Sequence, residues 1–257
     1  MSVDVAVRVS GVAKSFIREN RGRATVVPVL GDVSFDISRS EFVSIVGPSG
    51  CGKTSLLRSV AGLLAVDAGT IEVNGAVVTG PGRERAVVFQ DFALLPWASS
   101  LDNVAFGLKL QGVGRAERRR RAKAALDLVG LDGFADAFPH ELSGGMRQRV
   151  GIARALSVDP EVLLMDEPFG SLDEITRRSM QEELLRIWER DKKTVLFITH
   201  SVEEALFLSD RVLVMGGKPG HVVQTITPDL PRPRTRSQES TEAFTSLRDK
   251  VWETLAC

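Results

Sequence analysis

The chain has 257 residues, enough for one large domain, or a core with subdomains, around a substantial apolar interior. Lysine and arginine together number 33, as do aspartate and glutamate, so the formal net charge is zero and bulk electrostatic binding of nucleic acid is not expected. No apolar run approaches the roughly 20 residues of a membrane-spanning helix. The two cysteines, Cys51 and Cys257, are too few for a disulfide framework.

The first predicted elements are strands. Residues 3–9 and 33–37 alternate apolar and polar side chains, as half-buried strands do. The first strand is expected to end near Phe16, and the polar stretch IRENRGRAT (17–25) is expected to be a loop. EFVSIV (41–46) is short, apolar and rich in β-branched residues, which is typical of a buried parallel strand.

A glycine-rich stretch, GPSGCGKT (47–54), follows that strand and leads into the helical pattern TSLLRSVAGLL, which Gly62 weakens near its end. Short strands are expected at 70–73 and 85–89. Residues 97–140 then change to helical periodicity with charged faces, which predicts an inserted helical lobe. Its basic cluster at 115–123, RAERRRRAK, is interpreted as a solvated helix face.

From residue 145 onward, helical and strand patterns alternate through MRQRVGIARAL, VLLMD, ITRRSMQEELLRIWER, TVLFIT, VEEALFL and RVLVM. This alternation predicts a parallel sheet with helices on both faces. The tail from residue 227 is rich in proline and charge and is expected to be a surface linker. A short amphipathic helix, FTSLRDKVWETL, is expected to close the chain.

GPSGCGKT matches the phosphate-binding pattern G-x-x-x-x-G-K-[ST] in the required place, between a strand and a helix, which argues against a chance match. Its glycines let successive backbone N–H groups turn toward phosphate oxygens. Lys53 supplies a charge for the β and γ phosphates, and the Thr54 hydroxyl can ligate Mg²⁺. Cys51 is either a small residue that the turn accepts or a thiol whose pKa the helix N-terminus lowers. The predicted nucleotide contacts are Gly47, Pro48, Ser49, Gly50, Cys51, Gly52, Lys53, Thr54 and Ser55.

The apolar strand VLLMDEP (162–168) ends in two carboxylates, at the strand end where ligands meet an open α/β sheet. Asp166 is placed to hold Mg²⁺, and Glu167, one residue later, to orient and deprotonate the attacking water. Helix capping is the alternative for adjacent acids at such a position. His200, at the end of TVLFIT, is expected to contact the γ-phosphate, although a lone histidine is more often structural. Gln90 ends another strand, and its amide can contact the metal or the water.

In this order, GPSGCGKT, Gln90, LSGGM (142–146), VLLMDE, SLD (171–173) and His200 resemble the ATPase subunits of ABC transporters, from Phe16 to the PRPR tail. In that family two domains pack head to tail, and each signature loop completes the ATP site of its partner. The resemblance therefore implies that Ser143, Gly144 and Gly145 bind the partner's γ-phosphate and that Asp173 lines the interface. It also places Phe16 against adenine. Met146 departs from the family's usual glutamine, and Ser40 stands where the family normally has glycine.

Further stretches, including LLPWASSLDNVAFGL (94–108) and DLPRPR, are similar to the ATPases of nitrate, sulfonate and taurine importers. The resemblance implies ATP and Mg²⁺ as cofactors. Its implied partners are a second copy of the chain, transmembrane permease subunits that grip the region around Trp97 and, indirectly, a periplasmic solute-binding protein. No nucleic-acid partner is expected. The implied location is the cytoplasmic face of a bacterial inner membrane.

The predicted fold is α/β: a P-loop NTPase core with a mostly parallel sheet, an N-terminal antiparallel β subdomain and an inserted α-helical subdomain. The ATP-binding domain is expected over 1–233, with its helical subdomain at about 97–145, and a C-terminal tail over 234–257. The alternatives are an ABC ATPase that drives a regulatory or mechanical membrane partner, one that acts in DNA repair or translation, and a P-loop kinase. The kinase leaves ELSGGMRQR unexplained.

Overall fold

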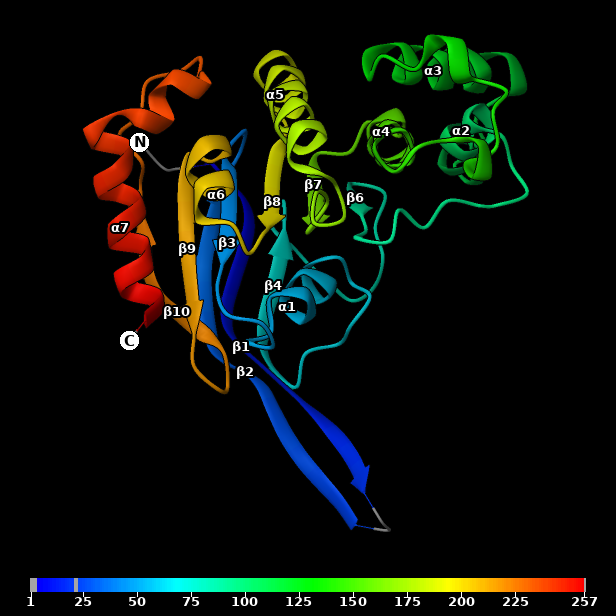
Figure 1. The fold of residues 1–257 in the computed structure, drawn as a ribbon. Helices are drawn as coiled ribbons and strands as arrows, with labels where there is room; N and C mark the ends of the chain where they lie inside the picture. Colours follow the sequence, from blue (N-terminus) through cyan, green and yellow to red (C-terminus); the bar gives the residue numbers. More distant parts are fainter. Residues whose placement is uncertain (1–3, 21–22, 257) are drawn as a thin grey trace. The chain divides into compact units, whose positions relative to one another are not determined.

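The structure, a computed structural model, describes residues 4–20 and 23–256. The chain divides into two compact units (Figure 1), here called unit 1 (1–82 and 192–257) and unit 2 (83–191). Each unit combines strands with helices, and the strands of the central sheet pair in parallel within both units, which agrees with the predicted α/β class. The prediction of one ATP-binding domain over 1–233 with a separate tail remains a prediction.

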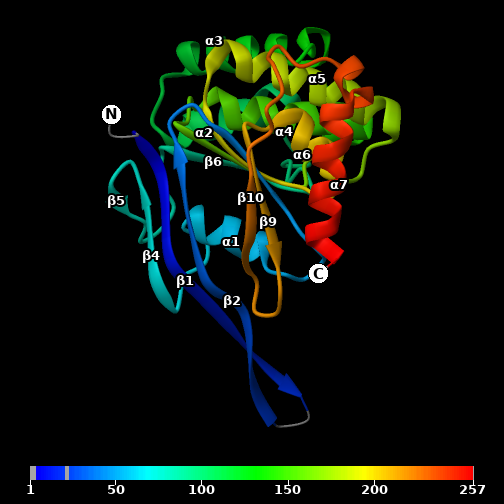
Figure 2. The ribbon, with the colours of Figure 1, turned by 90° about the vertical axis from the view of Figure 1, so that its left-hand side faces the viewer.

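The first part of unit 1 is an antiparallel sheet with the strand order β2-β1-β4-β5 (Figure 2). Its strands are β1 (Val5–Asn20), β2 (Arg23–Ser38), β4 (Ala68–Val73) and β5 (Ala76–Val77). The loop predicted over 17–25 is wrong for residues 17–20 and 23–25, because β1 runs to Asn20 and β2 begins at Arg23, and these paired ends form a two-stranded arm. Residues 21–22 of that prediction lie outside the described part of the chain. Cross-strand pairs in the arm join Phe16 to Val27 and Ile17 to Val26, and these β-branched and aromatic side chains favour pairing over a loop.

The central sheet of unit 1 contains β3 (Phe42–Val46), β8 (Thr194–Ile198), β9 (Arg211–Gly216) and β10 (His221–Ile226). Strand β3 pairs in parallel with β8 and with β9, and β10 pairs with β9 antiparallel. All residues of β3 and β8 are buried, as the continuous apolar runs predict. Strand β10 was not predicted, because its half-exposed sequence HVVQTI follows a Gly-Gly-Lys-Pro-Gly turn.

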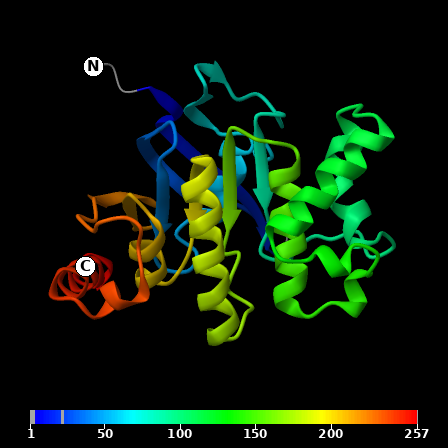
Figure 3. The ribbon, with the colours of Figure 1, turned by 90° about the horizontal axis from the view of Figure 1, so that it is seen from above.

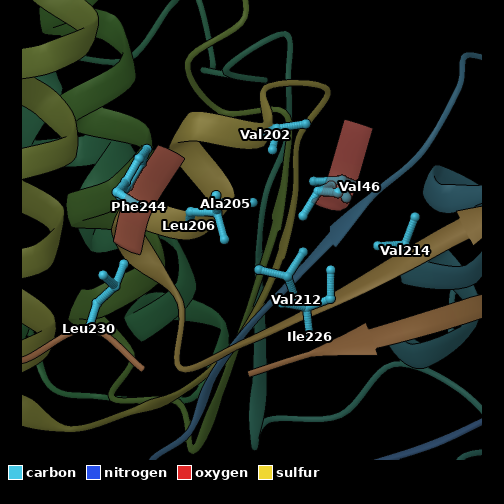
Figure 4. Close-up of a cluster of buried hydrophobic side chains, with 10 residues drawn as sticks. Val46, Val202, Ala205, Leu206, Val212, Val214, Ile226, Leu230 and Phe244 are labelled. Atoms are coloured by element: carbon cyan, nitrogen blue, oxygen red, sulfur yellow. The ribbon is translucent and has the colours of Figure 1, made fainter. Parts of the chain in front are cut away.

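Three helices belong to unit 1: α1 (Lys53–Val60), α6 (Val202–Leu208) and α7 (Glu242–Ala256). Helix α7, drawn in red in Figure 3, buries Phe244 and Val251 in an apolar cluster that also includes Val46 at the end of β3 and residues of α6 and β9 (Figure 4). The surface linker predicted from residue 227 is wrong, because Leu230 and Arg234 of this segment are buried.

Unit 2 pairs β6 (Arg85–Val88) in parallel with β7 (Val162–Asp166). Its helices are α2 (Ser100–Leu110), α3 (Arg115–Leu128), α4 (Gly144–Ser157) and α5 (Glu174–Asp191), with short 3-10 turns at Asp132–Phe134 and Pro139–Glu141. Helices α2, α3 and α4 pack on one another (green in Figure 3), as the helical periodicity after residue 97 predicts. In the described part of the chain, no helix has the length and apolar character needed to cross a membrane.

Candidate functional site

The phosphate loop joins β3 to α1 in unit 1. Gly50 and Gly52 have φ values of +82° and +97°, a conformation that glycine adopts without steric cost. The Lys53 side chain is 6% exposed, and its Nζ donates to the carbonyl oxygens of Gly47 at 2.7 Å and Pro48 at 3.1 Å. The ammonium group is therefore held within the loop, where it can meet a phosphate, next to the positive N-terminal end of α1.

Close backbone packing fixes the shape of this loop. A Cβ built at Gly47 would lie 2.4 Å from the carbonyl oxygen of Met215 in β9, and one built at Gly220 would lie 1.8 Å from that of Cys51. Gly220 also exchanges backbone hydrogen bonds of 2.9 Å with Val29 and Gly31 of β2. Gly220 was not predicted as a site residue, because it lies about 170 residues beyond the loop and only the folded chain brings it there. Cys51 is 1% exposed, which favours its interpretation as a packing residue.

His200 lies at the same edge of the unit 1 sheet as the phosphate loop. Strands β3 and β8 are parallel neighbours, with Ile45 opposite Ile198, and the N–H of Thr199 donates to the Ile45 carbonyl at 3.2 Å. The loop follows one strand, and His200, which is exposed, follows the other. The structure thus brings together two site elements that are about 150 residues apart in sequence.

Phe16 lies on the arm of unit 1 and is 41% exposed, so part of its side chain is accessible to a ligand. Lys14 Nζ lies 5.7 Å from the ring centroid and also pairs with Asp67 Oδ1 at 2.7 Å. Hydrogen bonds from the Lys14 side chain and from the backbone N–H of Ser15 lower the pKa of Asp67. The base of the arm is therefore tied to the start of β4.

The two predicted carboxylates lie at the end of β7 in unit 2. Asp166 is 5% exposed, and Glu167 has a backbone φ of +44°. A Cβ built at Gly170 would lie 3.9 Å from both Gln90 Nε2 and Glu167 Oε2, so these two side chains converge on one spot. Backbone strain of this kind in a non-glycine residue costs on the order of 1–3 kcal/mol and is concentrated at functional sites. The positive φ of Glu167 was not predicted from the sequence.

The LSGGM segment forms the start of α4 in unit 2. Ser143 is the N-cap, and its Oγ accepts from the Met146 N–H at 3.3 Å. A Cβ built at Gly145 would lie 2.7 Å from Thr176 Cγ2, and the Thr176 N–H donates to Asp173 Oδ1 at 3.0 Å. Hydrogen bonds from the Thr176 backbone and side chain lower the pKa of the Asp173 carboxyl. The start of α4 therefore packs against the segment that contains Asp173.

Helix α4 also holds the segment that follows Gln90. Phe92 and Ala93 have φ values of +58° and +46°, and Arg154 donates to their carbonyl oxygens at 2.8 Å and 2.6 Å. The Arg147 guanidinium lies 5.8 Å from the centre of the Phe92 ring. Burial lowers the pKa of Arg154. Arg154 and Arg147 were not predicted, because such contacts of arginine with backbone have no local sequence signature.

A groove of about 330 Å³ in unit 2 lies between this segment and helices α2 and α3. Trp97 on its wall is 75% exposed. Asn103, which is fully buried, shapes the loop that carries Trp97: its amide exchanges hydrogen bonds with both backbone groups of Leu95 and donates to the carbonyl oxygens of Ala98 and Ser99. The lining residues are Leu95, Trp97, Ala98, Asp102, Ala105, Phe106, Lys109 and Arg118.

These residues fit ATP with Mg²⁺. The glycine-rich loop of unit 1 holds a buried ammonium group between its own carbonyl oxygens, which is the position of a phosphate ligand. Thr54 in unit 1, and Gln90 and Asp166 in unit 2, each carry an oxygen atom, the kind of ligand that Mg²⁺ prefers. That they share one ion remains a prediction. When bound, Mg²⁺ neutralises charge on the β and γ phosphates.

Comparison with known proteins identifies the family. Residues 30–170, more than half of the chain, match the family described as ABC transporter. The chain belongs to the ABC transporter family. It is 52% identical over 93% of its length to the taurine import ATP-binding protein TauB of Rhizobium johnstonii, covering 92% of that protein. It is 47% identical over 96% of its length to the uncharacterized ABC transporter ATP-binding protein MJ0412 of Methanocaldococcus jannaschii, covering 90% of it.

A solved structure gives the same result for the fold. The dimeric post-hydrolysis state of the ATP-binding cassette MJ0796, bound to ADP and Pi, matches with a TM-score of 0.74 and 31% identity, over 86% of this chain and 98% of that one. The predicted P-loop NTPase fold is confirmed. The chain is the ATP-binding subunit of an ABC transporter, an ATPase whose cofactors are ATP and Mg²⁺. The roles assigned to its individual residues remain predictions.

Proposed function

We propose that this ABC transporter subunit couples ATP hydrolysis to the uptake of a small oxyanion, with nitrate, aliphatic sulfonates and taurine as the candidates. The observation that carries the proposal is the 52% identity to a taurine import ATP-binding protein over almost the full length of both chains. The stretches at 94–108 and 229–234 add to it, since they resemble the same branch. Cargo specificity would lie in the membrane subunit and the solute-binding protein.

We assign the chemistry to residues of both units. Lys53 and the N–H groups of its loop would bind the β and γ phosphates, Thr54 and Asp166 would hold the metal ion, and Glu167 would take the proton of the attacking water. The convergence of Gln90 and Glu167 on one spot supports a shared role in positioning that water. His200, at the same sheet edge as the phosphate loop, would contact the γ-phosphate.

The reaction would require two copies of the chain packed head to tail. Ser143 caps the start of α4 with its side chain. A Cβ built at Gly144 would lie 3.9 Å from a methyl group of Leu172, which is ordinary contact. This leaves the N-terminal end of α4 open to a phosphate from a partner subunit. The dimeric cassette bound to ADP and Pi supports this arrangement. ATP would then join the copies, and hydrolysis would release them.

The groove beside Trp97 would receive a helix of the membrane subunit. Its lining combines apolar side chains, Trp97 and Phe106 among them, with Lys109 and Arg118, as suits an amphipathic helix. The chain would then be a peripheral subunit at the cytoplasmic face of a bacterial inner membrane. The segment between Gln90 and Trp97 would transmit the nucleotide state to that partner.

The test is uptake by vesicles that contain the chain together with a candidate permease and a candidate solute-binding protein. Uptake of labelled taurine, an alkanesulfonate or nitrate that needs internal ATP supports the proposal. Glu167→Gln should retain ATP binding and lose about 10²–10⁴-fold in turnover, and uptake should fall with it. Asp132→Asn, an exposed acid on a 3-10 turn, serves as the matched control and should behave as wild type.

Hydrolysis that the permease stimulates, without uptake of any of the three solutes, would contradict import and favour a regulatory or mechanical membrane partner. Turnover of Glu167→Gln near the wild-type rate would mean that another group is the base.

A further inference from the structure

The tail segment PRPRTR (231–236) encloses the C-terminal end of α6. Arg234 is 7% exposed, although arginine is rarely buried to this degree without partners. Its Nη1 donates to three backbone carbonyl oxygens: those of Leu206 at 2.9 Å, Phe207 at 3.2 Å and Ser209 at 2.5 Å.

The two neighbouring arginines bind the same helix end. Arg232 donates through Nη2 to the Leu208 carbonyl at 2.8 Å and through Nε to Asp210 Oδ1 at 2.9 Å. Arg236 places its guanidinium 4.0 Å from the centre of the Phe207 ring. Three arginines at alternate positions of the tail therefore contact the C-terminal end of α6. None of these contacts involves the nucleotide site.

Such contacts matter for a helix as short as α6, which runs only from Val202 to Leu208. The last carbonyl groups of any helix have no partner within it, and they form its negative pole. Cations placed there satisfy both the hydrogen bonds and the dipole. A helix of this length is not stable by propensity alone, so its position depends on what holds its two ends.

The other end of α6 leads directly to the site. Ser201 is the N-cap, with its Oγ accepting from the Glu204 N–H at 3.2 Å, and His200 is the residue before it. Val202, Leu206 and Val46 lie in one apolar cluster with Phe244 and Val251 of α7 (Figure 4).

Asp210 connects the tail to the strand that leads to the phosphate loop. Its Oδ2 accepts from the N–H of Phe42, the first residue of β3, at 2.9 Å, while its Oδ1 accepts from Arg232. The tail thus contacts α6 at one end, and through Asp210 it reaches β3. His200 precedes α6 by two residues, and the phosphate loop follows β3.

We propose that Arg234 is a positioning residue for ATP hydrolysis: through its hydrogen bonds to the end of α6, it sets the place of His200 relative to the phosphate loop. The inference rests on the proposed function of His200 and assigns a role to the tail, which the sequence alone leaves without one. Arg232 and Arg236 also bind the C-terminal end of α6 and help to hold the tail against it.

The experiment measures ATPase kinetics of purified variants with MgATP. Arg234→Met, which keeps much of the side-chain volume, should lower kcat about tenfold or more, because small displacements of a group at the reacting phosphate are costly. KM for ATP should stay within about twofold, since Phe16 and Lys53 are untouched. Arg248→Ala removes an arginine of α7 that pairs with its neighbour Asp249, and it should have no effect.

A double-mutant cycle with His200→Ala separates positioning from general destabilisation. If Arg234 acts through His200, adding Arg234→Met to His200→Ala should lower kcat by less than about twofold. If Arg234→Met lowers kcat by the same factor in the wild-type protein and in His200→Ala, the inference is overturned and the proposed function remains intact. Full turnover of His200→Ala would refute the role of the histidine and this inference with it.

Folding is checked by thermal melting, with Arg234→Lys as a second variant that keeps the charge on a side chain one bond shorter. Intermediate kcat in the lysine variant, with a melting temperature near that of wild type, supports the inference. If neither variant folds, Arg234 is a determinant of folding and the inference fails.

Discussion

Gly220 is not among the site residues predicted from the sequence, yet a Cβ at this position would clash with the backbone of the phosphate loop. A Cβ at this position would stand 1.8 Å from the Cys51 carbonyl oxygen, well inside van der Waals contact. The residue also forms an isolated bridge with Leu30 of β2. The turn between β9 and β10 therefore packs against the backbone of the phosphate loop.

Gly220→Ala should accordingly displace the loop. We expect a lower affinity for MgATP and a melting temperature lower by about 5 °C, because overpacking at a site bounded by backbone costs roughly 1–3 kcal/mol. Gly80→Ala is the matched control, since nothing lies within 4 Å of a Cβ there. Calorimetric titration with ATP and thermal melting check both variants. Wild-type affinity in Gly220→Ala would show that the loop adjusts to the added methyl group.

Asp173 has two possible roles that substitution can separate. Its Oδ1 accepts from the Thr176 N–H at the start of α5, as an N-cap does, and the resemblance to ABC ATPases places the residue at the subunit interface. Asparagine keeps the hydrogen bond and removes the charge, whereas alanine removes both.

We expect Asp173→Ala to lower the melting temperature more than Asp173→Asn, which loses the charge but keeps the hydrogen bond. The pKa of Asp173 is lowered in the fold, so the stabilisation by the carboxylate is present above its unfolded pKa and is lost as the pH falls through the lowered value. Melting curves of the three proteins between pH 7 and about pH 3 check this. A loss in ATP-dependent dimerisation by Asp173→Asn alone would instead show that the charge acts at the interface.

At the scale of the elements, α4 joins two parts of the proposed mechanism. Its first residues are Gly144 and Gly145, and three turns later Arg154 holds the carbonyl groups of Phe92 and Ala93. These two residues are strained, and strain of this kind persists only where neighbouring groups enforce it. A displacement of α4 would therefore move the segment that leads to Trp97.

Arg154→Met should release this segment. Because two charge-assisted hydrogen bonds are lost, amide hydrogen exchange over residues 91–99 should accelerate about tenfold or more while that of β7 stays unchanged. Arg121→Met on α3, an exposed arginine that pairs with Glu117 on the same helix, is the control. Unchanged exchange in Arg154→Met would show that Asn103 and its neighbours hold the segment without the arginine.

The elements differ in how far their sequence predicts them. The phosphate loop and the carboxylates after β7 were identified because the residues that act together are adjacent in sequence. The arm around Phe16 was mistaken for a loop, since its polar residues hide cross-strand pairs that only the folded hairpin forms. The tail was mistaken for a linker because a buried arginine such as Arg234 looks, in sequence, like an exposed one. Contacts between distant segments leave no local pattern.

At the scale of the whole molecule, the balance of charge bears on function. The chain carries 33 cationic and 33 anionic side chains, so it lacks the long-range field that draws proteins to nucleic acid. Its basic cluster on α3 is partly neutralised, because Glu117 pairs with Arg120 at 2.7 Å and with Arg121 at 2.8 Å. These pairs lower the pKa of Glu117 to about 2, so the carboxylate stays charged at any physiological pH.

We therefore expect no stimulation of ATPase activity by double-stranded DNA or by RNA. A protein that neutralises several phosphates would show binding that weakens steeply as salt rises, and none should be measurable at about 0.15 M salt. ATPase assays and fluorescence anisotropy with labelled duplexes, across a salt series, check this. Replacing Arg115, Arg119 and Lys123 together by glutamine tests the cluster itself. Stimulation by nucleic acid that this variant loses would favour a role in DNA repair or translation over transport.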